Sequence, residues 1–246
     1  MLVKSQIKYI QSLGHKKFRD AEGVFVAEGP KIVQELLQCM HTSLIRLYAT
    51  REWLLENETW FSPNEAATEI DAHELERISF LSTPSRVLAI FRKPVFPVLE
   101  EPEGIILLLD NIQDPGNLGT IVRTADWFGV RRIVCSVDTA DLFNPKVVQS
   151  TMGSIARVEV LYMDLKEYMN AHPDIPSYAA MLDGKDLDQI QRIPEGLILL
   201  GNESRGIHKE LAALAQHRIR ITRKGAADSL NVAVATGIIL SMIQKG

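Results

Sequence analysis

The chain has 246 residues, of which 46% are hydrophobic and 24% are charged, and its net charge is −4. These proportions are those of an ordinary globular protein, and they exclude disordered and fibrous architectures. The length suits one large domain or a small domain joined to a medium one, and a net negative charge argues against nucleic-acid binding by the whole surface.

Three features bear on where the protein works. The longest uncharged, mostly apolar stretch, 229–243, has only fifteen residues, which is too short to span a bilayer. The first twenty residues lack the apolar block of a secretory signal. Cys39 and Cys135 lie in unrelated contexts, unlike a metal pair or a disulfide framework. We therefore expect a cytoplasmic protein with reduced thiols, no membrane segment and no metal.

A proline-rich segment divides the sequence. Residues 93–104 have the sequence KPVFPVLEEPEG, a composition poorly suited to a helix or a central strand. We therefore predict a small α/β domain at 1–93, a linker at 94–103 and a second domain at 104–246.

In the first domain, helical and strand patterns alternate. The predicted elements are a helix at 6–13, a strand at 24–27, a helix at 30–39, and strands at 44–49 and 87–91. Further short elements lie between the last two strands. This pattern indicates a small α/β unit.

The second domain continues the alternation. The predicted strands are 105–109, 133–137, 157–161, 177–181, 197–200 and 218–221, and the predicted helices are 118–128, 145–152, 165–171, 208–215 and 230–243. Runs such as Ile-Ile-Leu-Leu-Leu are apolar throughout, as is typical of parallel strands covered by helices on both faces. The sequence therefore predicts a doubly wound α/β domain.

Three loops follow strands of this sheet, at the edge where parallel sheets bind ligands. The first, 110–124, contains Asn117 and Arg123. Asp-Pro-Gly can form a turn and Asn117 can cap the helix that follows, which puts Arg123 on its second turn. Alternatively, Arg123 can reach a neighbouring loop or another subunit, and its planar guanidinium is suited to holding a phosphate in two places.

The second loop, GNESRGI, occupies residues 201–207. Gly201 lets the backbone approach a ligand closely, and Glu203 can accept hydrogen bonds from a ligand or cap the next helix. The chain contains neither GxGxxG nor the P-loop motif.

The third loop, TRKGAADSLN, occupies residues 222–231 and leads into the last helix. Asp228 or Ser229 is a candidate cap, which puts Asn231 in the first turn at the mouth of the sheet. Asn231 is thus either a helix-capping residue or a polar group of a binding site.

Two short segments, 4–19 and 218–224, carry positive charge without acidic residues. The second contains Arg218, Arg220, Arg223 and Lys224. Each segment can be a solvated face or a set of phosphate contacts. The candidate RNA contacts are Lys4, Lys8, Lys16, Lys17, Arg19 and Arg223.

Together, the three loops resemble the three motifs of the SpoU/TrmH-type RNA ribose 2′-O-methyltransferases of the SPOUT superfamily. DNIQDPGNLGTIVRTADWFG resembles the first motif, LLGNESRGI the second and ITRKGAADSLNVAVATGI the third. Residues 5–37 are more loosely similar to the start of the substrate-binding domain of many members, which resembles a ribosomal-protein RNA-binding fold.

The resemblance implies a trefoil-knotted parallel-sheet methyltransferase domain preceded by a small α/β substrate-binding domain. It also implies S-adenosylmethionine as methyl donor and a homodimer whose active site uses both subunits. By the same resemblance, the cofactor is held by Gly201, Ile221 and Leu230, and the catalytic centre is lined by Asn117, Arg123, Glu203, Ser229 and Asn231. Thr222 and Arg223 follow Ile221 where many members have Pro-Met or Pro-Gly, which affects the expected shape of the adenine pocket.

Methyl transfer to a ribose hydroxyl is an in-line displacement, so the protein must align the oxygen and help remove its proton. A guanidinium essentially does not deprotonate in proteins. We therefore expect Arg123 to bind the phosphate beside the target ribose and to stabilise the developing alkoxide, while Asn117, Asn231 and Glu203 orient the reacting groups.

Several alternatives stay open. Ribosomal RNA is the expected substrate by analogy, with transfer RNA as the alternative. A non-catalytic RNA-binding scaffold of the same fold would not bind the cofactor, and a base methyltransferase of the superfamily would modify a guanine nitrogen, although Ser229-Leu230-Asn231 favours ribose. A small-molecule enzyme has no support from nucleophile, metal or paired-carboxylate motifs.

Overall fold

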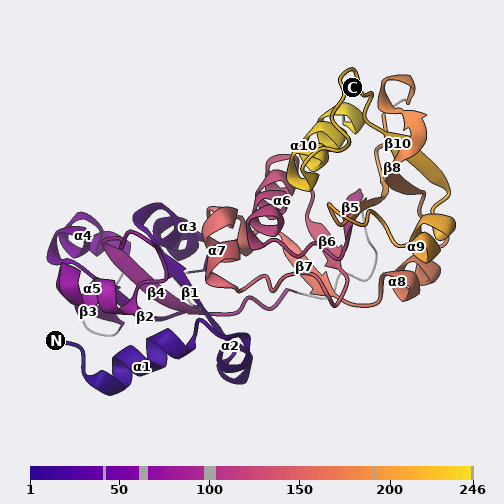
Figure 1. The fold of residues 1–246 in the computed structure, drawn as a ribbon. Helices are drawn as coiled ribbons and strands as arrows, with labels where there is room; N and C mark the ends of the chain where they lie inside the picture. Colours follow the sequence, from indigo (N-terminus) through magenta and orange to yellow (C-terminus); the bar gives the residue numbers. More distant parts are fainter. Residues whose placement is uncertain (41–42, 61–65, 97–103, 191, 245–246) are drawn as a thin grey trace. The chain divides into compact units, whose positions relative to one another are not determined.

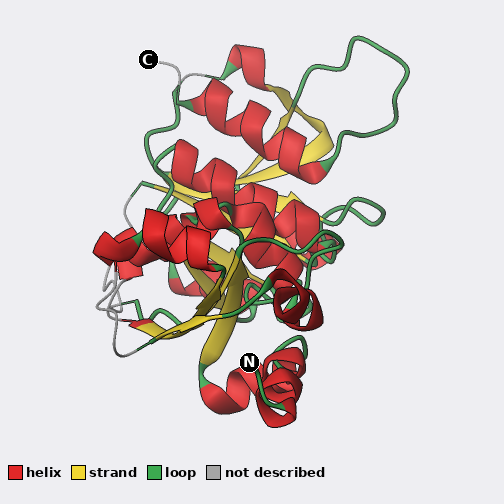
Figure 2. Cartoon of the chain, turned by 90° about the vertical axis from the view of Figure 1, so that its left-hand side faces the viewer, coloured by secondary structure: helices red, strands yellow, loops and turns green. Residues whose placement is uncertain are grey.

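The computed structural model describes residues 1–40, 43–60, 66–96, 104–190 and 192–244, which form two compact units (Figure 1). The first contains Met1–Phe96 and Asp141–Arg157, and the second contains the described residues of Pro97–Ala140 and Val158–Gly246. Figure 2 shows the helices of the chain in red and its strands in yellow. By the contacts that define the two units, residues 141–157 pack with the first unit. The predicted division at 94–103 had assigned them to the second domain.

A four-stranded sheet in the order β1-β4-β2-β3 forms the centre of the first unit. β4 pairs antiparallel with β1 and β2, and β2 pairs parallel with β3. The bounds are β1 Val24–Glu28, β2 Leu44–Ala49, β3 Ala67–Glu69 and β4 Val87–Arg92. The predicted strands at 24–27, 44–49 and 87–91 are confirmed.

Both faces of β1 are buried, so helices must cover the sheet on both sides. Val24 and Val26 belong to a core with residues of α1 and α5, whereas Phe25 packs against Phe91 and Phe143, and α3 and α7 contact β1. The helix bounds are α1 Lys4–Ser12, α2 Lys16–Glu22, α3 Pro30–Met40, α4 Arg51–Glu56, α5 Ala72–Ile78 and α7 Pro145–Thr151. The sequence patterns did not predict α2, which ends at Gly23 in the left-handed conformation (φ 64°).

The second unit is built on a six-stranded, all-parallel sheet in the order β10-β8-β9-β5-β6-β7. The bounds are β5 Ile105–Asp110, β6 Arg132–Cys135, β7 Glu159–Tyr162, β8 Ser177–Asp186, β9 Gly196–Gly201 and β10 His217–Arg220. Every predicted strand of this domain is present, although β8 extends five residues beyond the predicted end at 181.

Helices cover both faces of this sheet, as predicted. Ile106 and Leu108 of β5 share a core with residues of α8 and α9, while α6 and α10 pack against each other and α10 contacts β9 (Figure 1). The helix bounds are α6 Pro115–Trp127, α8 Leu165–Ala171, α9 Lys209–Leu214 and α10 Val232–Ile243. Within the described ranges, no helix combines the length and the apolar character needed to cross a membrane.

Candidate active site

Helix α6 begins directly after β5 and presents Asn117 in its first turn. The Asp114 carboxylate caps the helix by accepting the Asn117 N–H at 2.8 Å, and Pro115 occupies the first helical position. The sequence-based assignment of Asn117 as the cap is therefore wrong, because Asp114 already satisfies the free backbone donor. The Asn117 side chain is left to bond with other loops.

Asn117 connects the three loops that the sequence singled out. Its Nδ2 donates to Glu203 Oε1, and its Oδ1 accepts from Asn231 Nδ2 at 2.9 Å. Asn231 Oδ1 in turn accepts the backbone N–H groups of Ala233 and Val234 at 3.0 and 3.3 Å, so Asn231 itself caps α10. The predicted cap at Asp228 or Ser229 is wrong. Three of the five predicted catalytic residues thus form one hydrogen-bonded row, which we call the Glu203–Asn117–Asn231 row.

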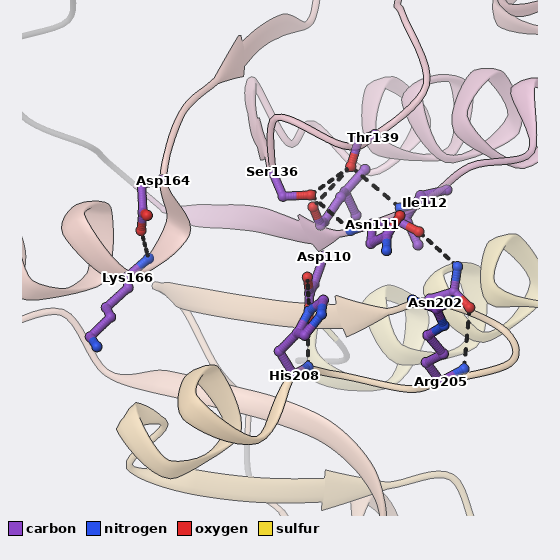
Figure 3. A network of polar contacts seen from close by, with 11 residues as sticks. Asp110, Asn111, Ile112, Ser136, Thr139, Asp164, Lys166, Asn202, Arg205 and His208 are labelled. Atoms are coloured by element: carbon purple, nitrogen blue, oxygen red, sulfur yellow. Dashed lines mark hydrogen bonds and ion pairs between the residues drawn. The ribbon is translucent and has the colours of Figure 1, made fainter.

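The loop that carries Glu203 is tied to the end of β5 on one side by Asn202 (Figure 3). Asn202 Nδ2 donates to the Asn111 carbonyl at 2.8 Å, and Asn202 Oδ1 accepts the N–H of Ser204 at 2.9 Å. Asn111 has a positive φ of 58°, which asparagine tolerates better than most residues. The first and second loops are therefore joined through backbone as well as side chains.

On its other side, the same loop is held by the buried Asp110 (Figure 3). The Asp110 carboxylate accepts the His208 N–H at 2.7 Å, and the Nδ1 of the His208 ring lies 2.8 Å from Asp110 Oδ1. Sequence reasoning missed His208, since nothing local indicates a partner 98 positions away. Asp110 and Asn111, consecutive residues, thus fix both ends of the segment around Glu203.

Gly201 is required by the loop's own path. A Cβ at Gly201 would lie 2.3 Å from both the Gly206 carbonyl carbon and the Ile207 nitrogen. We expected Gly201 to allow close approach of a ligand, but protein backbone fills that space. Substituting Gly201 would therefore disturb the loop itself, and it is not a selective probe of ligand binding.

A cavity of about 360 Å³ lies along the third loop, between β8 and the start of α10. The predicted cofactor residues Ile221 and Leu230 line it, together with the predicted catalytic residue Ser229; Gly201 is not among the described residues that do. Its apolar lining also includes Ala180, Met181, Leu182, Ile219 and Ile239. A largely apolar cavity of this size suits a small organic ligand.

Hydrogen bonds fix the start of the third loop where many SpoU/TrmH-type sequences have proline. The Thr222 hydroxyl lies 3.1 Å from Asp186 and 3.0 Å from Asp188. Arg220 donates twice to Asp186, at 2.8 and 3.0 Å, and this guanidinium holds the pKa of the Asp186 carboxyl below its usual value. The carboxylates of Asp186 and Asp188, which accept from its hydroxyl, thereby hold Thr222 in place.

The basic segment at 218–224 is partly neutralised by β8. Arg218 pairs with Asp183 at 2.8 Å and Arg220 pairs with Asp186, whereas Arg223 is exposed and donates to the Ala227 carbonyl at 3.4 Å. The expectation that the whole segment offers phosphate contacts is therefore too broad. Arg223 and the exposed Lys224 are the members without an acidic partner among the described residues.

The remaining predicted residues have different surroundings. Arg123 is exposed on α6, and no described residue is its polar partner; Ser229 is exposed as well. In the first unit, Lys4, Lys8, Lys16 and Lys17 are exposed on α1 and α2.

Arg19 is the exception among the predicted RNA contacts. It is 1% exposed, donates to the Leu13 carbonyl at 2.7 Å and forms an ion pair with Asp141 at 2.5 Å. Its assignment as an RNA contact is wrong for this structure, because the guanidinium is buried within the first unit. Elsewhere in the described chain, no group of three or more His, Cys, Asp or Glu side chains is placed to hold a metal ion.

The fold and the site define an α/β protein in which three loops of a parallel sheet meet in one polar row near an apolar cavity, in a chain with a second, smaller α/β unit. The chain belongs to the SpoU rRNA Methylase family, whose model matches residues 104–241. Residues 4–89 match the model of the MRM3-like substrate binding domain. Both matches confirm the resemblance seen in the sequence motifs.

Relatives match nearly the whole chain. The 23S rRNA (guanosine(2553)-2′-O)-methyltransferase RlmP of Bacillus subtilis (strain 168) is 30% identical over 96% of this chain and 94% of its own. A structure from Porphyromonas gingivalis, assigned to the TrmH family of RNA methyltransferases, has a TM-score of 0.86 at 38% identity, covering 99% of this chain and 98% of that chain. An rRNA methyltransferase from Sinorhizobium meliloti with bound AdoMet has a TM-score of 0.85 at 29% identity, covering 99% and 95%.

Proposed function

We propose that this protein is an S-adenosylmethionine-dependent RNA methyltransferase that transfers a methyl group to a ribose 2′-hydroxyl of ribosomal RNA. The observation that carries the proposal is the Glu203–Asn117–Asn231 row, which unites the three family motifs near the cavity of the third loop. The rRNA 2′-O-methyltransferase of Bacillus subtilis, similar over nearly its whole length, supports ribose and ribosomal RNA as targets. Transfer RNA is the alternative substrate.

The cavity fits the cofactor in size and chemistry. Its volume of about 360 Å³ is within the range of small-molecule sites, and its apolar walls suit a flat nucleoside base. Ile221 and Leu230 would contact the cofactor there, and Gly201 would act through the shape of the second loop. When bound, S-adenosylmethionine supplies a methyl group on a sulfonium that needs no further activation.

The Glu203–Asn117–Asn231 row can orient a ribose. Asn231 is fixed by the first N–H groups of α10, and it fixes Asn117, whose amide then has a defined direction. One N–H of the Asn117 amide and the second carboxylate oxygen of Glu203 stay available to a substrate hydroxyl. Such an arrangement aligns the 2′-oxygen with the methyl donor, which is where most of the rate gain of a displacement arises.

We further propose that Arg123 acts in the site of a second copy of the chain. On a single chain, Arg123 is exposed on α6, without a polar partner among the described residues. Trp127 of α6 and Val234 of α10 are 84% and 52% exposed, and these two helices pack against each other, so they offer an apolar surface for a homodimer. In that dimer Arg123 would bind the phosphate beside the target ribose.

The proposed function also includes a trefoil-knotted domain and a cytoplasmic location. It further includes a catalytic role for Ser229 and RNA contact by Arg223.

Calorimetric titration with S-adenosylmethionine tests the cofactor site. The wild-type protein is expected to bind saturably, and Leu230→Asp is expected to weaken binding at least about tenfold, because a carboxylate would be desolvated against an apolar wall. Leu214→Asp, at an exposed position of α9 outside the cavity lining, is the matched control and should bind normally. Absence of binding by the folded wild type, with and without ribosomal RNA, would favour the non-catalytic scaffold.

Two substitutions of Asn231 distinguish its role as a helix cap from its role in catalysis. Asn231→Ala removes the helix cap and the bond to Asn117, so we expect a loss of about 1 kcal/mol of stability together with most of the methyl transfer. Asn231→Asp keeps the cap acceptor but loses the donor to Asn117, so stability should be kept while transfer falls. Thermal unfolding and incorporation of labelled methyl groups into rRNA measure the two effects. Asn144→Asp, at the cap of α7, is the control that should change neither.

Alkaline hydrolysis of the labelled product distinguishes the remaining alternatives. A 2′-O-methyl group makes the adjacent phosphodiester resistant to alkali, whereas methylation of a base nitrogen does not. Parallel assays with ribosomal and transfer RNA identify the substrate class. Alkali-sensitive product would contradict ribose methylation.

A further inference from the structure

An exposed aromatic ring lies among the basic residues of the first unit. Phe18 of α2 is 45% exposed. Among the described Phe, Trp and Tyr residues, only Phe18 and Trp127 are exposed. The ring of His15 lies 6.4 Å from the Phe18 ring at an angle of 63°. The exposed residues Lys16 and Lys17 separate the two in sequence. Two rings and two ammonium groups are thus exposed within four consecutive residues at the start of α2.

The acidic residues of α2 have closer partners than these lysines. Asp20 is paired with Lys93 at 2.5 Å, which lowers the pKa of its carboxyl, and Glu22 accepts a hydrogen bond from the Tyr9 hydroxyl at 3.2 Å. Neither Lys16 nor Lys17 forms an ion pair with any residue that the structure describes. Their charge is therefore available to an anionic partner.

The turn beneath Phe18 is fixed. Arg19, the next residue, is buried and joins the Leu13 carbonyl to Asp141, so the backbone from α1 into α2 has little freedom. A ring projected from a rigid turn loses little conformational entropy when a ligand covers it. The buried Arg19 thereby holds the backbone of Phe18 in a fixed position before a ligand binds.

We propose that Phe18 is a stacking platform for an unpaired nucleobase of the RNA substrate, with Lys16 and Lys17 binding the flanking phosphates. This inference rests on the proposed function, since it takes RNA as the substrate. A phenylalanine face stacks on any base, which is how many proteins hold single strands, whereas a base within a duplex cannot reach it. Lysine contacts to phosphates add affinity that depends on salt.

Fluorescence anisotropy with a labelled, unstructured 12-nucleotide RNA and its blunt duplex tests the platform on the full chain. Phe18→Leu is expected to weaken binding of the single strand about fivefold or more without changing the slope of log Kd against log salt. Affinity for the duplex should stay the same. Phe18→Trp should bind the single strand as wild type does, and Leu55→Ala, which alters another exposed apolar residue of the same unit, should too.

Lys16→Ala combined with Lys17→Ala should instead reduce the salt slope. The platform is contradicted if Phe18→Leu, at unchanged melting temperature, binds the single strand as tightly as wild type, or if it weakens single strand and duplex equally. It is also contradicted if the wild type binds no single strand at low salt.

Cofactor titration and rRNA methylation are measured separately on wild type and Phe18→Leu. A wild type that methylates rRNA while Phe18→Leu keeps full single-strand affinity would overturn the platform alone. A wild type that binds single strands through Phe18 but binds no S-adenosylmethionine would overturn the proposed function alone.

Discussion

Replacing Arg123 by lysine is expected to lower kcat for rRNA methylation about 10²- to 10³-fold, the usual cost of losing one preorganised group that stabilises transition-state charge. Lysine keeps the positive charge but lacks the planar fork that holds a phosphate in two places. Because Arg123 is exposed, the melting temperature and the affinity for S-adenosylmethionine should not change. Single-turnover methyl transfer at saturating RNA is the measurement.

Arg131→Lys provides the control, since Arg131 is another exposed arginine of the same unit. Mixing inactive Arg123→Ala subunits with inactive Asn117→Ala subunits tests action across a dimer. Hybrid dimers would contain one site with both wild-type residues, so part of the activity should return. Near-wild-type turnover by Arg123→Lys would refute the electrostatic role, and a failure of the mixed subunits to recover would refute the shared site.

Replacing Arg19 by methionine is expected to destabilise the first unit by about 3–5 kcal/mol, because it leaves the mostly buried Asp141 carboxylate without its cation. The side chains of Arg19 and Asp141 are 2% and 15% exposed, so water replaces the lost partner poorly. Denaturant unfolding followed by circular dichroism measures the loss.

Lys17→Met, which removes an exposed positive charge two residues away on α2, should change stability by less than about 0.5 kcal/mol. Combining Arg19→Met with Asp141→Leu should recover much of the loss, since no charge then remains buried. If Arg19 were a phosphate contact, Arg19→Met would leave stability intact and reduce the salt dependence of RNA binding.

The sequence predicted the second unit well because its strands are long apolar runs and its loops carry recognisable motifs. The first unit was predicted less completely: α2 has few apolar residues, and its place depends on Arg19, whose partner Asp141 lies 122 positions away. A buried arginine and a solvated one have the same sequence signature, so the pattern of basic residues could not separate Arg19 from Lys16 and Lys17.

The two helix caps were within reach of the sequence. Asp114 precedes a proline, the usual order at a helix start, and Asn231 directly precedes the apolar run of α10. What no local pattern could give is that Asn117 and Asn231 bond to each other across 114 positions, since that depends on the strand order that sets their loops side by side.

Residues 141–157 belong to the first unit by packing, although they lie between β6 and β7 of the second in the chain. Phe143 packs on Phe25, and α7 contacts β1, so the core of the first unit is incomplete without this segment. During synthesis, an N-terminal domain commonly folds as soon as its last residue leaves the ribosome. Here that point comes only after residue 157, so β5, α6 and β6 of the second unit emerge before the first unit can complete its core.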